Sequence, residues 1–366
     1  MIIFTSICAN YLHKARTLAA SVKENIPDAT FVVCLCEREI KPEWNDEAFD
    51  RVVLACDAWD GNFDRFIYKH AIVEASTAVK GQFFRFLYRE YPNEESFVYL
   101  DPDIYVYSDF PELRQILREH PIIVCPHLLV PGNIEMELSS TMHGVYNLGF
   151  LAVDHSKEAQ SFIDWWAARL FQYCYDDIPH GIFTDQHWID LAPCFFDVLV
   201  CRHHGYDFAT WSIKGSVIKK RGDVYFVNGD PLRFIHFSGY GASAEHCMEQ
   251  WLPDKTHLFY ELYAEYGKKH NANNADHVSA TPWSYACYRD GRPISNKLRV
   301  RYRQNEKVMN ACDDPFALSD REIRRRLRRD HLPYPHQIAW AKARAIIKEG
   351  GMPLLISRFK KKLLHK

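Results

Sequence analysis

The sequence predicts an α/β protein built on a doubly wound, mainly parallel sheet. Short apolar segments of strand length alternate with longer segments of helical periodicity, which is typical of parallel sheets covered by helices. The apolar segments are continuous, as in strands that are buried on both faces. Polar residues directly follow some of these segments, at the edge where such sheets bind ligands.

The first hundred residues contain four predicted strands. MIIFTSICAN, at residues 1–10, is the first strand and ends in small and polar residues. A helix is predicted next, because Leu12, Ala15, Ala19 and Val22 recur on one helical face. The elements that follow are, in chain order, the strands TFVVCLC and RVVLAC, the helix FFRFLYREY and the strand SFVYL.

The alternation continues to about residue 245 and then ends. Further strands are predicted at PIIVCP, VYNLGFLAV, DVLVC and RFIHF, with a helix at AQSFIDWWAARLFQY. The later segment KKHNANNADHVSATPW is polar and poor in large apolar residues, which indicates a boundary. We therefore expect a core domain at residues 1–262 and a C-terminal appendage at residues 263–366.

The composition is that of a globular protein, which we expect to be cytoplasmic. Apolar residues make up 47% of the 366 residues and charged residues 25%. The 11 cysteines lie in apolar contexts, and the spacing of Cys34 and Cys36 fits no CxxC pair, so reduced thiols are expected. The first 15 residues lack the features of a signal peptide, and no apolar run approaches the roughly 20 residues of a membrane-spanning helix.

Asp101-Pro102-Asp103 is the strongest short motif. It follows the apolar strand FVYL, so two carboxylates stand where a buried strand reaches the edge of the sheet. A turn at this point lets both carboxylates converge on one cation, and the proline limits the conformation of that turn. Hard oxygen ligands favour Mg²⁺ or Mn²⁺, with phosphate oxygens completing the coordination. Without this context, a solvated turn is the commoner interpretation of two aspartates one residue apart.

Two further signals follow later in the chain. His236 ends the apolar strand RFIHF and is a candidate third ligand for Mn²⁺, although a lone histidine is more often a hydrogen-bonded core residue. Asp185 and Gln186, in FTDQHW, pair a carboxylate with an amide that together could hold sugar hydroxyls. The alternative is that Thr184 or Asp185 caps the start of a helix, and both interpretations can hold at once.

The order of these motifs resembles a known enzyme family. The matching segments are FTSICANYLHKARTLAASV, FFRFLY, FVYLDPDIYVYSDFPEL, NLGFLAV, TDQHWID and FIHFSGY. Together they look like a glycosyltransferase of the GT-A fold, most similar to the retaining, nucleotide-sugar-dependent enzymes of family 8. The resemblance covers roughly residues 1–245. It implies that residues 1–262 are a catalytic domain that transfers a hexosyl unit.

The resemblance also implies roles for individual residues. By it, the metal, Mn²⁺ or Mg²⁺, is held by Asp101, Asp103 and His236. The donor, expected to be a UDP-sugar, is bound by Thr5, Ser6, Asn10, Arg85 and Gly239. The reacting sugars are contacted by Asn147, Asp185 and Gln186. The family usually follows its metal-binding histidine with a lysine, which contacts phosphate, and a Pro-Trp, whereas this chain has HFSGYGASAEHC without such a lysine.

Two other classes of protein remain open from the sequence. A nucleotidyltransferase acting on sugar phosphates would share the sheet and the metal carboxylates. It should also carry a glycine-rich basic loop after the first strand, and TSICANYLHKA contains no glycine. A non-catalytic sugar-nucleotide-binding protein should have lost metal ligands, whereas all three candidates are present.

Charge is unevenly distributed along the chain. Residues 321–366 hold 14 Lys and Arg against 3 Asp and Glu, whereas the rest holds 31 against 44. A basic helix is predicted after Ser319, and residues 352–366 have an amphipathic pattern that suits an anionic membrane surface. This would place the enzyme on the inner face of the membrane, near a lipid-linked saccharide acceptor of surface-polysaccharide synthesis. Packing of the basic helix on the acidic body is an equal alternative, and no nucleic-acid partner is expected.

Overall fold

The structure, a computed structural model, describes residues 1–318 and 320–329. The chain divides into two compact units, Met1–Cys287 and Tyr288–Lys366. The predicted division at residue 262 falls within a helix of the first unit, α10 (Leu258–Ala272). The assignment of residues 1–262 as a catalytic domain stays a prediction.

A seven-stranded sheet forms the centre of the first unit. In spatial order its strands are β10 (Val198–Val200), β6 (Ile122–Pro126), β7 (Tyr146–Val153), β4 (Phe97–Leu100), β1 (Ile2–Ile7), β2 (Thr30–Leu35) and β3 (Arg51–Leu54). All neighbouring pairs are parallel except the two that involve β7, which runs antiparallel to β4 and β6. The predicted α/β fold with a mainly parallel sheet is therefore confirmed.

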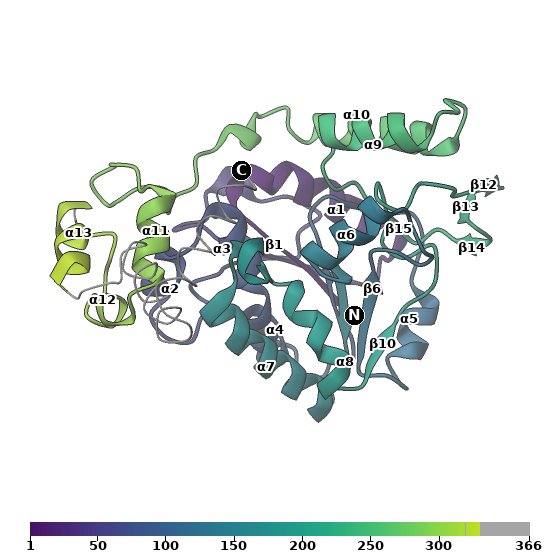
Figure 1. Ribbon diagram of the computed structural model, residues 1–366. Coiled ribbons are helices and arrows are strands. Elements are labelled where there is room, and N and C mark those ends of the chain that lie inside the picture. The colour runs from purple at the N-terminus through teal and green to yellow at the C-terminus, as the bar shows by residue number, and fades with distance from the viewer. Residues whose placement is uncertain (319, 330–366) are drawn as a thin grey trace, which may run out of the picture. The chain divides into compact units, whose positions relative to one another are not determined.

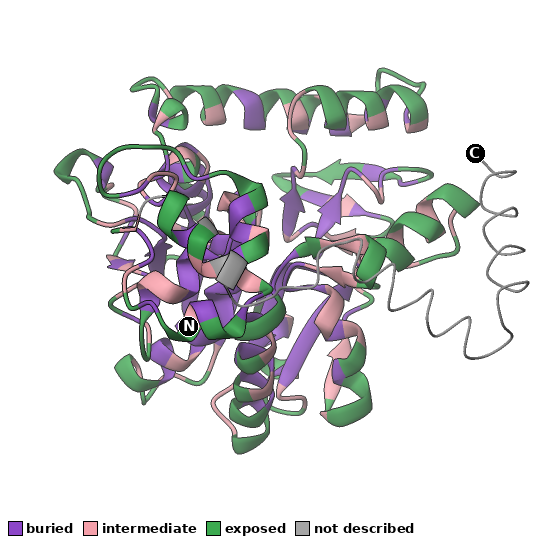
Figure 2. Ribbon diagram, turned by 60° about the vertical axis from the view of Figure 1, so that its left-hand side comes forward, coloured by how far each residue is buried: buried purple, intermediate pink, exposed green. Residues whose placement is uncertain are grey.

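Helices cover this sheet; its inner strands are buried, whereas the edge strands β3 and β10 are mostly half-buried (Figures 1 and 2). The helices of the first unit are α1 (Leu12–Asn25), α2 (Phe63–Tyr68), α3 (Ile72–Ala78), α4 (Lys80–Glu90), α5 (Pro111–Ile116), α6 (Ile134–His143), α7 (Lys157–Tyr173), α8 (Ala192–Phe195), α9 (Ala242–Trp251) and α10. The predicted apolar face of α1 is buried at all four of its positions. Gly81 of α4 lies against the backbone of Ala167 in α7, so that these two helices pack closely.

Three smaller sheets accompany the central one. The sheet that matters for the site joins β11 (Phe208–Ala209), β15 (Phe234–His236) and β5 (Ile104–Val106). The other two comprise β12 (Ile218–Arg221), β13 (Val224–Val227) and β14 (Asp230–Pro231), and the pair β8 (Asp176–Asp177) and β9 (Ile182–Phe183). Because β5 follows β4 after a three-residue turn, the small sheet begins where the buried strand β4 ends.

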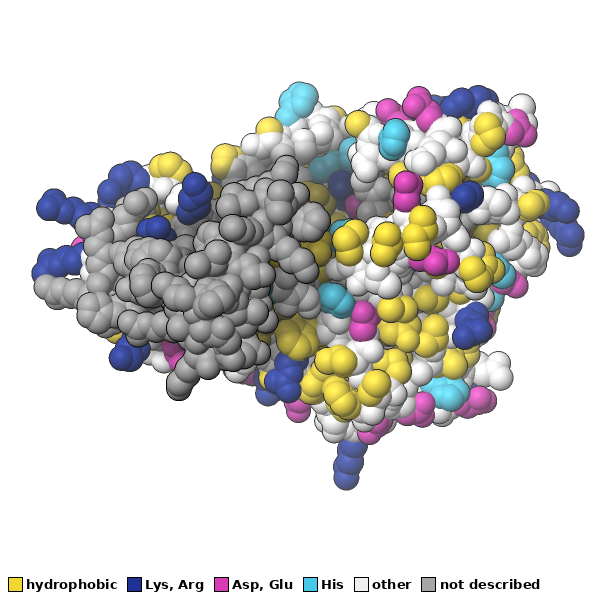
Figure 3. All heavy atoms as spheres, in the orientation of Figure 1, with side chains coloured by type: hydrophobic (Ala, Val, Ile, Leu, Met, Phe, Trp, Pro, Cys, Tyr) yellow, Lys and Arg dark blue, Asp and Glu magenta, His cyan; other side chains and the backbone are white. Residues whose placement is uncertain are grey.

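Helix α6 differs from the other long helices because none of its residues is buried. Its side chains Ile134, Leu138 and Met142 are each about half exposed or more and recur every four residues. Figure 3 shows apolar side chains, in yellow, gathered where Figure 1 draws this helix.

The second unit is helical where the structure describes it. It contains α11 (Asn296–Arg303), α12 (Glu306–Asn310) and α13 (Asp320–Arg329). The predicted basic helix is confirmed over the length of α13, whereas the predicted amphipathic tail at residues 352–366 lies outside the described residues. No helix among the described residues is both long and apolar enough to cross a membrane.

Candidate active site

Backbone pairing brings the Asp-Pro-Asp motif and the distant histidine together. The amide of Asp101 donates to the carbonyl of Gly149 in β7 at 2.8 Å, which holds the end of β4 in the central sheet. The chain then turns into β5, which pairs antiparallel with β15. Because the amide of Phe237 donates to the carbonyl of Asp103 at 2.9 Å, His236 must lie beside the motif.

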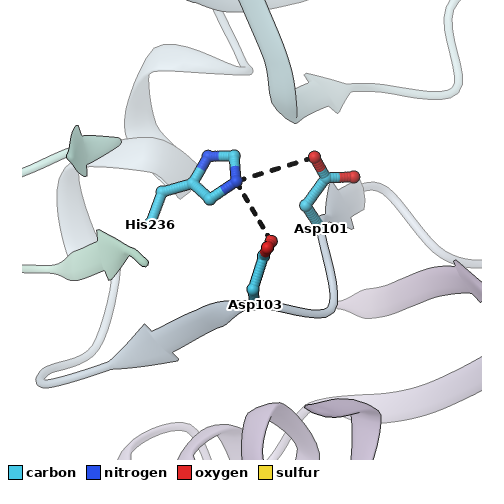
Figure 4. Close-up of side chains that lie close together, drawn as sticks. All are labelled: Asp101, Asp103 and His236. Carbon is cyan, nitrogen blue, oxygen red and sulfur yellow. Dashed lines mark ion pairs between the residues drawn. The ribbon is translucent and has the colours of Figure 1, made fainter. Parts of the chain in front are cut away.

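The three side chains converge on one point (Figure 4). His236 Nε2 is 3.1 Å from Asp103 Oδ1 and 3.7 Å from Asp101 Oδ2. One ligand atom from each residue lies within 4.8 Å of the others. Two carboxylates and an imidazole suit Mn²⁺ well and are also compatible with Mg²⁺. The donor set therefore fits the divalent cation that the sequence predicts.

Charges around this cluster are strongly coupled. Burial alone would raise the pKa of Asp103, but Lys14 and His236 hold it well below its ordinary value. Burial alone would lower the pKa of His236, yet the Asp103 and Asp207 carboxylates raise it to about 10. The carboxylates thus stabilise a positive charge at Nε2, and a divalent cation would compete with the proton there.

Two neighbours fix the orientation of the histidine ring. His236 Nδ1 lies 3.2 Å from Asp207 Oδ1. This contact orients the ring so that the other nitrogen, Nε2, faces Asp101 and Asp103. On another side, a β-carbon at position 149 would approach His236 Cε1 to 2.4 Å. Only glycine therefore leaves room for the imidazole, which explains the glycine in NLGFLAV.

Lys80, the first residue of α4, is the cation that links the acidic groups. Its buried ammonium lies 2.8 Å from Asp185 Oδ2 and 3.4 Å from Asp101 Oδ1, and it donates to the carbonyl of Leu148 at 3.0 Å. The ammonium also lies 3.9 Å from the centre of the Tyr99 ring. Burial would lower the pKa of Lys80, but Asp101 and Asp185 raise it, so the lysine stays charged.

A cavity of about 860 Å³ surrounds this cluster. Asn147, Asp185 and Gln186 line it together with the three candidate metal ligands. Gln186 Nε2 donates to the carbonyl of His143 at 2.8 Å, which fixes the amide beside the opening. Asp185 caps no helix: the short helical turn after it has no side-chain cap, and its carboxylate is paired with Lys80 instead.

The structure brings only some of the predicted donor-binding residues to this cavity. Ser6 and Asn10 line it. Thr5 is fully buried, and Gly239, with φ +67°, does not line the cavity, although its neighbour Ser238 does. Arg85 does not line it either, because its guanidinium faces Asp164 of α7 at 2.9 Å.

A comparison with protein families agrees with this geometry. Residues 2–160 match the model described as glycosyl transferase family 8. Over this segment the chain is similar to glycosyltransferases of family 8. The match confirms the expected resemblance and, for this segment, the glycosyltransferase class. Beyond residue 160, the resemblance depends on the quoted motifs and on where the structure places them.

The related proteins have low identity and match only part of the chain. The uncharacterized proteins YfnF and YfnD of Bacillus subtilis strain 168 are 28% and 24% identical over 159 and 157 residues. Each match covers 41% of this chain and 51% or 49% of the relative. The chain therefore spans about half the length of the curated relatives it matches.

Among solved structures, the galactosyltransferase LgtC, in complex with donor and acceptor sugar analogues, is similar at 15% identity. The match has a TM-score of 0.46 and covers 74% of this chain and 96% of that one. The glycosyltransferase GlyE of Streptococcus pneumoniae TIGR4 is similar at 13% identity, with a TM-score of 0.40 and coverage of 78% and 66%.

Sequence reasoning missed several residues of the site. Lys80 and Lys14 are single lysines in ordinary helical segments, and Asp207 lies in HGYDFATW, which matches no motif. Only the fold places them beside the acidic cluster. Only an electrostatic argument could have identified one of them. Buried carboxylates require nearby cations, so the lysine in STAVKGQFF, at the start of a mainly apolar helix, was a candidate partner for the acidic residues.

We predict that Lys80→Met lowers the free energy of unfolding by about 3–5 kcal/mol, because it leaves a buried carboxylate without its partner. The double variant Lys80→Met/Asp185→Asn should recover part of this loss. Chemical denaturation measures both. Arg51→Met is the control, because its pair with Glu90 is about 40% exposed and should contribute less than about 1 kcal/mol. Equal losses in the single and double variants would contradict the pairing.

Proposed function

We propose that the protein is a metal-dependent glycosyltransferase that moves a hexosyl unit from a nucleotide sugar to a saccharide acceptor. The observation that carries this proposal is the convergence of Asp101, Asp103 and His236 at a cavity that Asp185 and Gln186 also line. A metal held by the first three residues would bind a diphosphate, and the Asp185 carboxylate and the Gln186 amide can hydrogen-bond to sugar hydroxyls. The family match over residues 2–160 supports the same reaction class.

The donor is proposed to be a UDP-sugar. The cavity extends from the metal cluster to Ser6, Asn10 and Tyr11, which offers polar groups and an aromatic ring for a nucleoside. Lys14 supplies positive charge beside Asp103, at 3.4 Å, in a chain that lacks the family's lysine. These features support diphosphate binding without that lysine.

The acceptor is proposed to be a saccharide, either free or lipid-linked, in surface-polysaccharide synthesis. The charge surplus of residues 321–366 supports a peripheral position on the inner face of the membrane, in the cytoplasm. This part of the proposal depends on the composition of the tail, because residues 330–366 lie outside the described residues.

When bound, a divalent cation at this site supplies Lewis-acid stabilisation of the departing diphosphate. Asp101, Asp103 and His236 would hold that cation, and Gln186 would lie against the donor sugar. Asp185 is paired with Lys80, which makes it a poor nucleophile. The other carboxylate that lines the cavity, Glu135 of α6, is exposed. We therefore favour attack of the acceptor hydroxyl on the face from which the diphosphate leaves, with retention.

Removal of one metal ligand should abolish metal-dependent activity. We expect Asp103→Ala to lower Mn²⁺-dependent release of UDP from a UDP-sugar on the order of 10²–10³-fold, since the Lewis acid contributes several kcal/mol. Mn²⁺ with UDP should also raise the melting temperature of the wild type, and not of the variant. Asp109→Ala is the matched control, because Asp109 pairs with Arg114 outside the cavity. Full activity of Asp103→Ala in the presence of a chelator would refute the metal assignment.

The stereochemistry of transfer is a separate prediction. Because no unpaired, buried carboxylate lines the reaction cavity among the described residues, we expect same-face attack and a product with the anomeric configuration of the donor. Proton NMR of the product, recorded before mutarotation or on a glycosidic product, measures this directly. An inverted product would refute the retaining mechanism and leave the metal site unaffected.

A further inference from the structure

A second cavity opens beside the candidate active site. Its volume is about 410 Å³, and it shares only the side chains of His127, Leu128, Met136 and Trp211 with the larger cavity. None of the residues assigned above to the metal or the donor lines it. Trp211 stands between the two spaces, because it lines both and its ring centre is 5.2 Å from that of His236.

Three buried polar atoms on residues that line this second cavity have no hydrogen-bond partner in the described part of the chain: Asp207 Oδ2, Trp211 Nε1 and the Tyr206 hydroxyl. Asp207 is 4% exposed, and its Oδ1 lies next to His236. The Asp207 oxygen accepts hydrogen bonds, the Trp211 nitrogen donates one, and the Tyr206 hydroxyl can do either. Buried groups of this kind are normally satisfied, so their lack of a partner points to a ligand.

Most of the remaining lining is apolar and aromatic, whereas His204, Ser212, Lys214 and Asn228 add polar groups. Leu129, Tyr206, Phe208 and Val227 contribute to the walls along with Trp211. A sugar ring matches this combination, because its hydroxyls both donate and accept while its C–H face packs on apolar and aromatic surfaces. An alkyl chain would leave these polar atoms unpaired. An anion is disfavoured because the Asp207 carboxylate is buried in the cavity, whereas Lys214, which also lines it, is exposed.

We propose that this second cavity binds a saccharide unit of the acceptor, next to the unit whose hydroxyl attacks. The inference rests on the proposed function and deepens it, because it makes the preferred acceptor at least a disaccharide. The shared wall at Trp211 lets one unit reach the metal side while its neighbour occupies the second cavity. Asp207 then contacts both the bound saccharide and the metal-facing histidine.

The test compares acceptors of different length on the full-length protein. UDP release from UDP-glucose and UDP-galactose is measured with Mn²⁺, first without acceptor. The acceptors are then methyl glucoside, methyl galactoside, methyl maltoside, methyl cellobioside, methyl lactoside and octyl glucoside. We expect at least one disaccharide to have a KM about 10-fold below that of its monosaccharide. Leu129→Trp, which fills the second cavity, should remove this advantage and leave acceptor-free UDP release unchanged.

The matched control is Leu138→Trp, the same substitution at a residue that is 53% exposed on α6 and lines neither cavity. It should keep the preference for the disaccharide. Melting temperatures show whether each variant folds, and Leu129→Phe repeats the test with a smaller side chain if Leu129→Trp does not fold.

Four results would overturn the inference. These are equal KM values for mono- and disaccharides, no stimulation by any disaccharide, a disaccharide preference that persists in a folded Leu129 variant, and a preference for octyl glucoside that the variant loses. The last would assign the cavity to an alkyl chain. Failure of the wild type to bind UDP with Mn²⁺ or to release UDP without acceptor is a different outcome. It would overturn the glycosyltransferase proposal itself, and this inference with it.

Discussion

The site depends on the neutralisation of carboxylates that the fold collects at one edge of a buried sheet. Asp101, Asp103 and Asp185 lie close enough to repel one another, and water reaches them only partly. Lys80 compensates two of them from within the protein, and His236 faces the third. Burying these charged groups lowers the stability of the fold, since an apolar set of residues would pack as well without removing charges from water. A function in binding would explain why they are present. The carboxylate and imidazole ligands indicate that this function is the binding of a divalent cation.

The fold brings these residues together where the chain passes from the central sheet into a smaller one. Strand β4 ends in the central sheet, and β5 continues in a small sheet where β15 is its neighbour. The turn between β4 and β5 carries the two aspartates, and the last residue of β15 is the histidine. The same small sheet includes β11, which directly follows Asp207 and ends two residues before Trp211. The metal cluster and the second cavity are therefore built on one structural unit, which explains how an acceptor subsite can lie directly behind a metal ligand.

The elements that could be predicted from the sequence are those marked by a continuous apolar run or by a regular spacing of apolar residues. Apolar runs such as FVYL and NLGFLAV became central strands, and the periodic face of α1 is buried. The sequence also predicted which three residues would be near one another, because each ends or follows a buried strand. Contacts that depend on side-chain direction could not be predicted. Arg85 faces α7 while Lys80, five residues earlier on the same helix, reaches the acids, and no periodicity distinguishes these two cations. Asp207 carried no signal at all, because its partner is 29 residues away and its neighbours form no motif.

The central claim is that one divalent cation is held between Asp101, Asp103 and His236. The most direct test is a crystal structure with Mn²⁺ and UDP, with anomalous diffraction recorded on both sides of the manganese absorption edge. We predict one anomalous peak within bonding distance of the two carboxylates and the imidazole Nε2, with diphosphate oxygens on its open side. An ion at any other position would contradict the account. So would a UDP complex that contains no ion and in which Asp103 and His236 still pair directly with each other.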